Sequence, residues 1–299
     1  MHTKTLSIIT ANRQPSPKGT GNICCIVIPI YKNKLTEYEI TSLKQCCNIL
    51  GKHPIIFVTH RKLDCSYYDS ICCNADVSYR FEYFHSKYFF DVLSYNALML
   101  SRNFYKRFYS YDYMLIYQLD AYVFKDELEY WCKKGYDYIG APWLKLNKLK
   151  TMHEFADPPA VGNGGFSLRN IKIAIEKHPL RFSILSFMDL FQSYYNKISL
   201  KSKRNFYYFI PMFYLRCFLK LLKTIFCKIY TTDNEDVLWC CLLYKKGNIP
   251  PAIEATKFSF ELDPEYLYRI NNKNLPFGCH ACFTYKNYLF YKKYVKENF

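Results

Sequence analysis

The stretch YDYMLIYQLDAYVF, residues 111–124, places a carboxylate at the end of a run of apolar and aromatic residues. The β-branched, aromatic and long aliphatic side chains of residues 113–119 predict an interior strand. A buried, unpaired carboxylate would be costly, or it would take up a proton. We therefore expect Asp120 to emerge at the carboxyl end of this strand or to have a cationic partner there, and both arrangements indicate a site.

The residues before this strand predict an α/β fold. The continuous apolar run ICCIVIPIY, residues 23–31, is typical of a strand that is buried on both faces. A helical segment over residues 36–50, closed by Gly51, leads to a second strand over residues 54–60. This strand–helix–strand order implies a central, mostly parallel sheet with right-handed crossovers and flanking helices.

Two further helices are expected on either side of the central strand. One covers residues 94–109, and the other covers about residues 126–134 and ends at Gly135. Ligands in sheets of this kind bind outside the carboxyl ends of the strands, where the strand order reverses. Because Asp120 falls at such an end, it is the first candidate site residue.

The composition indicates a globular domain with a large core. Half of the 299 residues are apolar and 19% are aromatic, which argues against disorder. The formal net charge of +16 favours nucleic acid, phosphorylated small molecules or an anionic membrane as partners. Charge alone does not choose among these three.

The 14 cysteines indicate reduced core residues and a cytoplasmic protein. Many form adjacent pairs within apolar runs, such as Cys24-Cys25 and Cys240-Cys241, and no secretory signal precedes them. Buried thiols of this kind are typical of a reducing compartment. The C-x-x-C motif of Cys279 and Cys282 has no second pair, so it is a weak signal for structural zinc.

We expect one domain with a tail and an insertion. Residues 1–21 predict a flexible N-terminal tail, and residues 22–299 predict a single domain. Residues 181–231 are basic and strongly aromatic, and they predict a helical insertion. In its centre, residues 213–230, Arg216, Lys220 and Lys223 share one helical face. Two interpretations stay open: a helix packed on the domain with its basic side chains snorkelling outward, or an amphipathic element on an anionic membrane surface.

The stretch GNGGFSLR, residues 162–169, is the second candidate site. Gly162, Gly164 and Gly165 allow the backbone to approach a ligand closely, and Asn163 can offer an amide. A tight turn is the alternative, although three of the chain's ten glycines lie here. The spacings of the Rossmann and P-loop motifs are both absent.

Two later stretches carry the remaining candidates. In TTDNEDVLWCCLL, residues 231–243, Thr232 and Glu235 have the spacing of a capping box, so Glu235 has a structural explanation. Asp236 has none, and a carboxylate in a first helical turn suits a base or an acceptor-binding group. In LPFGCHACF, residues 275–283, His280 is either a core histidine with a partner or a metal ligand.

In this order the four stretches resemble the sequence elements of the GT-A-fold glycosyltransferases, which use nucleotide sugars. QLD is similar to a variant of their D-x-D motif, GNGGFSLR to their glycine-rich loop, NED to the element that opens the acceptor-side helix, and His280 to their C-terminal metal-binding histidine. VIPIY resembles their first strand. YDYMLIYQLDAYVF, YDYIGAPW and VGNGGFSLR also resemble a little-characterised family from bacterial surface-polysaccharide gene clusters. The resemblance covers about residues 23–280.

The resemblance implies a metal-assisted donor site. Asp120 and His280 would bind a divalent metal, Mn²⁺ or Mg²⁺, through which the diphosphate of a UDP-linked sugar is held. Gln118 stands in place of the first carboxylate of D-x-D, and an amide is a poor metal ligand, so metal dependence stays open. The other implied donor contacts are Pro29, Ile30 and Tyr31 at the base, Arg102 near the phosphates, and Asn163, Gly164 and Gly165 on the sugar and acceptor side.

The resemblance also implies the catalytic groups. Asp236 would deprotonate the acceptor hydroxyl if the enzyme inverts the anomeric centre, and Glu235 would bind the acceptor or cap its helix. We therefore expect a cytoplasmic glycosyltransferase that extends a glycan. The expected acceptor is a lipid-linked glycan at the inner membrane face, and we expect the protein to contact that membrane peripherally.

Two other classes of function are weighed against this one. A sugar nucleotidyltransferase would place a glycine-rich phosphate loop after the first strand, but PIYKNKLTEY contains no glycine. A non-catalytic basic module would bind a membrane or nucleic acid through exposed aromatic side chains. Most aromatic residues of this chain lie within apolar runs, which argues against nucleic acid.

Overall fold

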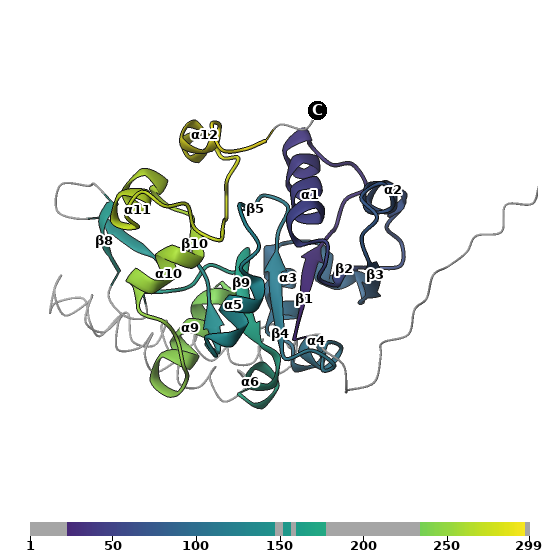
Figure 1. Ribbon diagram of the computed structural model, residues 1–299. Helices are drawn as coiled ribbons and strands as arrows, with labels where there is room; N and C mark the ends of the chain where they lie inside the picture. The colour runs from purple at the N-terminus through teal and green to yellow at the C-terminus, as the bar shows by residue number, and fades with distance from the viewer. Residues whose placement is uncertain (1–22, 147–151, 157–159, 178–233, 297–299) are drawn as a thin grey trace, which may run out of the picture.

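A computed structural model describes residues 23–146, 152–156, 160–177 and 234–296 (Figure 1). Its centre is a six-stranded sheet with the spatial order β3-β2-β1-β4-β9-β6. β1 pairs in parallel with β2 and β4, and β2 pairs in parallel with β3, whereas β9 runs antiparallel to β4 and β6. The predicted mostly parallel sheet is therefore confirmed. Its strands are β1 (Cys24–Pro29), β2 (Ile55–Thr59), β3 (Tyr79–Tyr83), β4 (Tyr113–Tyr117), β6 (Tyr138–Ile139) and β9 (Phe166–Asn170).

Helices cover both faces of this sheet. Side chains alternate between the two faces along each buried strand, so each face presents apolar side chains that a helical layer covers. Ile26 packs into one core, beneath α1 (Glu37–Leu50), α2 (Ser66–Asn74) and α5 (Leu128–Lys133). Its neighbour Val27 packs into the other core, with α3 (Val92–Met99), α4 (Arg102–Lys106), α6 (Ile171–Glu176) and α9 (Glu235–Lys246) (Figure 1). Two apolar cores of this kind explain why the strands read as continuous apolar runs.

The expected helix ends agree with the structure in two places and differ in a third. Thr36 caps α1 with a capping box, and Gly51 follows its last residue. Gly135 lies after α5 with a φ of 73°, which favours glycine. The single helix expected over residues 94–109 is wrong. It is divided into α3 and α4, because Ser101 adopts an extended conformation as the N-cap of α4.

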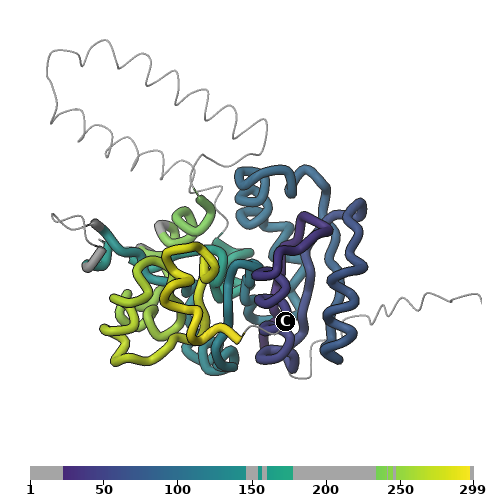
Figure 2. The backbone as a smooth tube through the Cα atoms, turned by 90° about the horizontal axis from the view of Figure 1, so that it is seen from above, coloured from purple at the N-terminus to yellow at the C-terminus, as the bar shows by residue number. Residues whose placement is uncertain are grey.

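A smaller sheet lies beside the main one. It has the order β10-β11-β5, formed by Ser259–Phe260, Gly278–Cys279 and Tyr122–Val123. A separate two-stranded sheet is formed by the antiparallel strands β7 (Leu144–Leu146) and β8 (Met152–Phe155). The remaining elements are η1 (Ser86–Phe89), α10 (Ala252–Phe258), α11 (Pro264–Ile270) and α12 (Tyr285–Tyr291). Figure 2 shows the N-terminal elements in purple and blue side by side with the C-terminal elements in green and yellow.

Several expectations concern residues that lie outside the described ranges. The predicted tail (residues 1–21) and the predicted insertion (residues 181–231) both belong to this group. Within the described residues, no helix combines the length and the apolarity that a membrane span requires. The core assignment of the paired cysteines is confirmed for Cys24, Cys25 and Cys240, which are buried. It is wrong for Cys73, which is exposed on α2.

Candidate active site

A pocket of about 580 Å³ opens at the carboxyl ends of β1 and β4. The sheet order reverses there, since β1 is followed in space by β2 on one side and by β4 on the other. Eleven of the twelve predicted site residues line this one pocket: Pro29, Ile30, Tyr31, Gln118, Asp120, Asn163, Gly164, Gly165, Glu235, Asp236 and His280.

The exception is Arg102. Its side chain is exposed on α4, and Arg102 is absent from the residues that line the pocket. The prediction placed Arg102 on a single helix over residues 94–109, near the phosphates. In the structure, Ser101 breaks this segment, and Arg102 is the first residue of a separate helix, α4. This geometry does not support a phosphate contact from Arg102.

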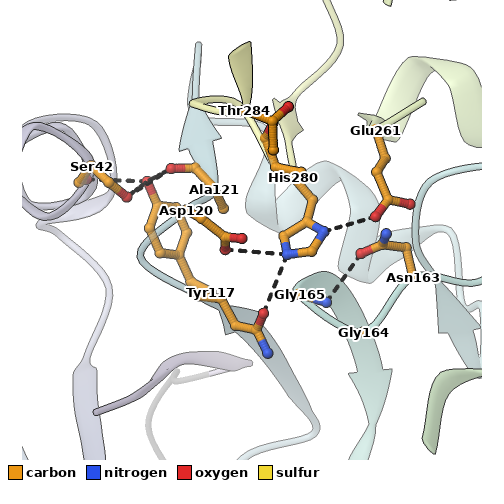
Figure 3. A network of polar contacts seen from close by, with 12 residues as sticks. Ser42, Tyr117, Asp120, Ala121, Asn163, Gly164, Gly165, Glu261, His280 and Thr284 are labelled. Atoms are coloured by element: carbon orange, nitrogen blue, oxygen red, sulfur yellow. Dashed lines mark hydrogen bonds and ion pairs between the residues drawn. The ribbon is translucent and has the colours of Figure 1, made fainter. Parts of the chain in front are cut away.

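Strand pairing explains why Asp120 and His280 meet. β10 and β11 run parallel, so their carboxyl ends carry Glu261 and His280 to the same edge of the small sheet. β5 runs antiparallel to β11, so the residues just before its amino end reach that edge as well. His280 Nε2 lies 3.2 Å from Asp120 Oδ1, and Nδ1 lies 3.1 Å from Glu261 Oε1 (Figure 3). Gln118 Oε1 lies 3.2 Å from the same Nε2.

The two carboxylates control the charge of the imidazole. Burial lowers the pKa of His280, but the hydrogen bonds that it donates to Asp120 and Glu261, together with the charges of these carboxylates, outweigh that effect and raise the pKa to about 10. Burial raises the pKa of Asp120, and the hydrogen bond and charge of His280 outweigh that effect and hold the pKa below its ordinary value. In this arrangement the imidazole is protonated, and a metal that binds Nε2 would have to displace that proton.

The donor set of this cluster fits a divalent metal. A metal-binding histidine commonly donates its second ring N–H to a carboxylate, which is the relation of His280 Nδ1 to Glu261. Nε2 and Asp120 would then be the two ligand groups, with the Gln118 oxygen beside them. No group of three or more His, Cys, Asp and Glu side chains suited to a metal occurs in the described ranges. Two protein ligands suit an ion that also binds phosphate oxygens and water.

The glycine-rich loop lies against this cluster and against the start of α9. A Cβ atom on Gly165 would overlap the His280 imidazole, and one on Gly164 would overlap the Glu235 carboxylate. Asn163 has a φ of 64°, and its Oδ1 accepts a hydrogen bond from Gly165 N at 3.1 Å. The glycines are therefore required for close packing of the site side chains, which a plain turn would not need.

Glu235 forms a buried ion pair that the sequence did not predict. Its two oxygens accept from Arg169 Nη2 at 2.7 Å and Nη1 at 2.9 Å, and the side chains are 3% and 2% exposed. Burial lowers the pKa of Arg169, and the neighbouring Glu235 outweighs it and raises the pKa well above its ordinary value. Arg169 also donates to the Gly164 carbonyl and the Tyr105 hydroxyl.

This pairing corrects the expected role of Glu235. The capping box with Thr232 requires Glu235 to be the third residue of its helix, but α9 begins at Glu235 after an extended Asn234. Thr232 itself lies outside the described residues. Because both oxygens of Glu235 bind Arg169, the carboxylate fixes the glycine-rich loop to α9, and an acceptor contact is not supported.

Asp236 faces the pocket from the next position. Its Oδ2 accepts from Gly164 N at 3.1 Å, and its Oδ1 accepts from Val237 N at 2.7 Å. The side chain is half-buried and lines the pocket. Gly164 therefore contacts Asp236 while the adjacent Gly165 contacts His280, so the predicted acceptor-side acid and the predicted metal ligand lie close together across one loop.

Sequence reasoning missed several residues that line the pocket. Glu261 follows a strand of only two residues, which is too short to recognise as a pattern. Lys32 forms an ion pair with Glu39 at 2.7 Å at the mouth of β1. Asn96 is a buried polar residue within the apolar segment YNALML, and this misfit was the one signal available.

The comparisons with known proteins give a family and distant structural likenesses. The family described as "Protein of unknown function (DUF5672)" matches residues 78–280, more than half of the chain. Among curated proteins there is no significant match. Of the solved structures, core-mannan synthase A (CmsA/Ktr4) from Aspergillus fumigatus in an Mn/GDP form shares 11% identity with a TM-score of 0.43, covering 77% of this chain and 72% of that one.

Two other solved structures show a similar degree of likeness. An active-site mutant of LgtC shares 14% identity with a TM-score of 0.48, over 87% of each chain. The apo-form glycosyltransferase GlyE from Streptococcus pneumoniae TIGR4 shares 11% identity with a TM-score of 0.44, over 91% of this chain and 60% of that one. Because all three TM-scores lie below 0.5, the function of this chain must be argued from its own pocket.

Proposed function

Since the chain belongs to the DUF5672 family, whose description assigns no activity, we propose its function from the pocket: it transfers a sugar from a nucleotide sugar to a hydroxyl group of a glycan. One observation carries the proposal. Asp120, Asp236 and His280, which are distant in sequence, line a single pocket of about 580 Å³ at the point where the sheet order reverses.

The charge balance of the pocket supports a cation-dependent donor. Six carboxylates line it, whereas Lys32 is the lysine among its lining residues and is paired with Glu39. A diphosphate would meet net negative charge here unless a cation came with it. Asp120 and His280 would hold a divalent metal, which when bound neutralises the charge that develops on a departing diphosphate. The six acids are Glu39, Asp91, Asp120, Glu235, Asp236 and Glu261.

The protein's own residues would bind the donor and activate the acceptor. Tyr31, two residues after the end of β1, is 62% exposed and is available to stack on a nucleotide base beside Pro29 and Ile30. Asp236 would accept the proton of the acceptor hydroxyl, because it is the pocket carboxylate next to the glycine-rich loop that is free of a cationic partner in the described contacts. Asn163, Gly164 and Gly165 would line the sugar.

We further propose a UDP-linked hexose as the donor and a lipid-linked glycan of surface-polysaccharide biosynthesis as the acceptor. The ordered motifs between residues 23 and 280 support this class of substrate by resemblance. The net charge of +16 would favour an anionic donor and an anionic membrane surface. Peripheral contact with the inner face of the cytoplasmic membrane belongs to the same proposal.

The test is a thermal-shift screen of nucleotide sugars with and without Mn²⁺, followed by a transfer assay with the donor that binds. A bound donor raises the melting temperature by mass action. We expect a shift that needs both Mn²⁺ and the nucleotide sugar, its loss in Asp120→Asn, and its retention in Asp236→Asn, which should bind the donor without transferring the sugar. Wild-type protein that responds to no nucleotide sugar, or an Asp236→Asn variant with full transfer, would overturn the proposal.

A further inference from the structure

Two side chains of α3 that line the pocket each carry a buried polar atom without a hydrogen-bond partner in the described residues. Asn96 is 4% exposed, and its Nδ2 has no partner in the described residues. The hydroxyl of the adjacent Tyr95 is also buried without a hydrogen bond of normal geometry, and Gln118 is its polar neighbour. Leaving a buried donor without a partner is energetically unfavourable, so such atoms are rare in folded proteins.

The position of these two groups separates them from similar cases elsewhere. Within the described residues, the other buried polar atoms without partners belong to Gln45, Thr59, Trp131, Tyr138 and Tyr291, and none of those residues lines the pocket. Tyr95 and Asn96 alone in this group combine an unpaired donor with a place on the pocket wall. Because a protein gains nothing from an unpaired donor, a ligand is the expected source of the missing acceptor.

Helix packing places this wall on the side of the pocket that carries Asp236. Trp239 of α9 donates from Nε1 to the carbonyl of Met99 on α3 at 3.3 Å, so α3 and α9 are held together. Burial raises the pKa of the Tyr95 hydroxyl, and the charges of Glu235, which raises it, and Arg169, which lowers it, also act on this group. Tyr95 and Asn96 therefore lie with the glycine-rich loop, where the sugar would bind.

We propose that Asn96, supported by Tyr95, selects the donor sugar by donating a hydrogen bond from Nδ2 to a hydroxyl oxygen of the transferred hexose. This inference rests on the proposed function. A site that holds an unpaired donor rejects an analogue that lacks the matching oxygen, because the donor then stays buried and unpaired. The preferred donor is accordingly a fully hydroxylated hexose, and its deoxy counterpart at the contacted position is discriminated against.

The experiment compares the binding of three kinds of probe by calorimetry in the presence of Mn²⁺: UDP, the UDP-hexoses UDP-glucose and UDP-galactose, and their monodeoxy analogues. For wild-type protein, we expect the preferred UDP-hexose to bind at least tenfold more tightly than one of its deoxy analogues. In Asn96→Leu, binding of that UDP-hexose should weaken about 10- to 100-fold, binding of UDP should be unchanged, and the preference over the deoxy analogue should disappear.

Two controls keep the result interpretable. Thr59→Val removes a buried hydroxyl that also has no partner but lies off the pocket, so it should leave all affinities unchanged. Asn96→Leu should melt at or above the wild-type temperature, because it removes an unpaired donor from the ligand-free protein. Should Asn96→Leu fail to fold, Asn96→Ala replaces it in the same comparison.

Each outcome decides the inference. An equal loss of UDP and UDP-hexose binding would assign Asn96 to the nucleotide and overturn the proposed sugar contact. Unchanged binding of every probe would overturn it as well. Wild-type protein that binds neither UDP nor any UDP-hexose would contradict the proposed UDP-linked donor, and the inference would fall with it, whereas the proposed function falls only if no nucleotide sugar binds. Normal wild-type binding combined with an insensitive variant would refute the inference alone.

Discussion

Two ionic clusters lie on opposite sides of the glycine-rich loop and differ in what surrounds them. The open cluster is formed by Asp120, His280 and Glu261, and the Asp120 side chain is 52% exposed toward the pocket. The closed cluster is formed by Arg169 and Glu235, which are both almost fully buried. Both contain a carboxylate and a cationic group within hydrogen-bond distance, so charge alone does not distinguish them.

The difference shows that exposure to the pocket, more than charge, separates a binding site from a support. In the closed cluster, both Glu235 oxygens accept from Arg169, whose remaining N–H groups bind Tyr105, Ser167 and the Gly164 carbonyl. All five N–H groups of Arg169 are thereby used, and the Glu235 side chain is only 3% exposed. In the open cluster, both imidazole nitrogens of His280 also have carboxylate partners, but the Asp120 side chain is 52% exposed and lines the pocket. We therefore expect substitutions in the open cluster to affect transfer and substitutions in the closed cluster to affect stability.

The largest expected effect is that of Asp120→Asn on transfer. Removing the carboxylate that holds the metal should lower kcat/KM about 1,000-fold or more, because the charge on the leaving diphosphate is no longer neutralised. The measurement is release of nucleoside diphosphate in the presence of acceptor. Glu129→Gln, on a side chain of similar exposure on α5, is the matched control and should keep wild-type activity. An Asp120→Asn rate within tenfold of wild type would remove the open cluster from the mechanism.

The second effect is the loss of stability when the closed pair is broken. Arg169→Met should lower the free energy of unfolding by about 3 kcal/mol, because Glu235 is then left buried without a partner. Urea denaturation at pH 7 measures this change. The double variant Arg169→Met with Glu235→Leu should recover part of the loss, since no unpaired charge remains. Equal stabilities of wild type and Arg169→Met would show that the pair is not the support described here.

Substitutions at the two adjacent glycines compare the clusters within one loop. Gly165→Ala should displace the His280 imidazole and lower transfer about 100-fold, since a shift of about 1 Å at a site can have that effect. Gly164→Ala should instead disturb Glu235 and lower the melting temperature more than Gly165→Ala does. Paired assays of kcat/KM and thermal unfolding test both statements. The same profile for the two variants would contradict a division of roles across the loop.

The smallest expected effect is that of Glu261→Gln. The amide can still reach His280 Nδ1 but carries no charge, so Mn²⁺ affinity should fall about tenfold while the ligands stay in place. Transfer measured at low and saturating Mn²⁺ should therefore differ from wild type only at low Mn²⁺. A defect that persists at saturating metal would indicate that Glu261 contacts substrate directly.

The sequence could predict the framework because strong local patterns specify it. The apolar runs of β1 and β4 identified the central strands, and position at a strand end identified Asp120 as a site residue. The pairing of Arg169 with Glu235 could not be predicted, because it joins residues 66 positions apart and depends on how α9 meets β9. Arg102 was misplaced because one extended residue, Ser101, interrupts a segment whose apolar pattern looks continuous.

The most direct test of the account is Mn²⁺ binding in the presence of UDP, measured by electron paramagnetic resonance as the loss of the free-ion signal. The account predicts that wild-type protein binds Mn²⁺ under these conditions, that Asp120→Asn and His280→Gln lose this binding, and that Asp236→Asn retains it. Equal Mn²⁺ binding by wild type and Asp120→Asn would contradict the claim that the open cluster holds the donor through a metal.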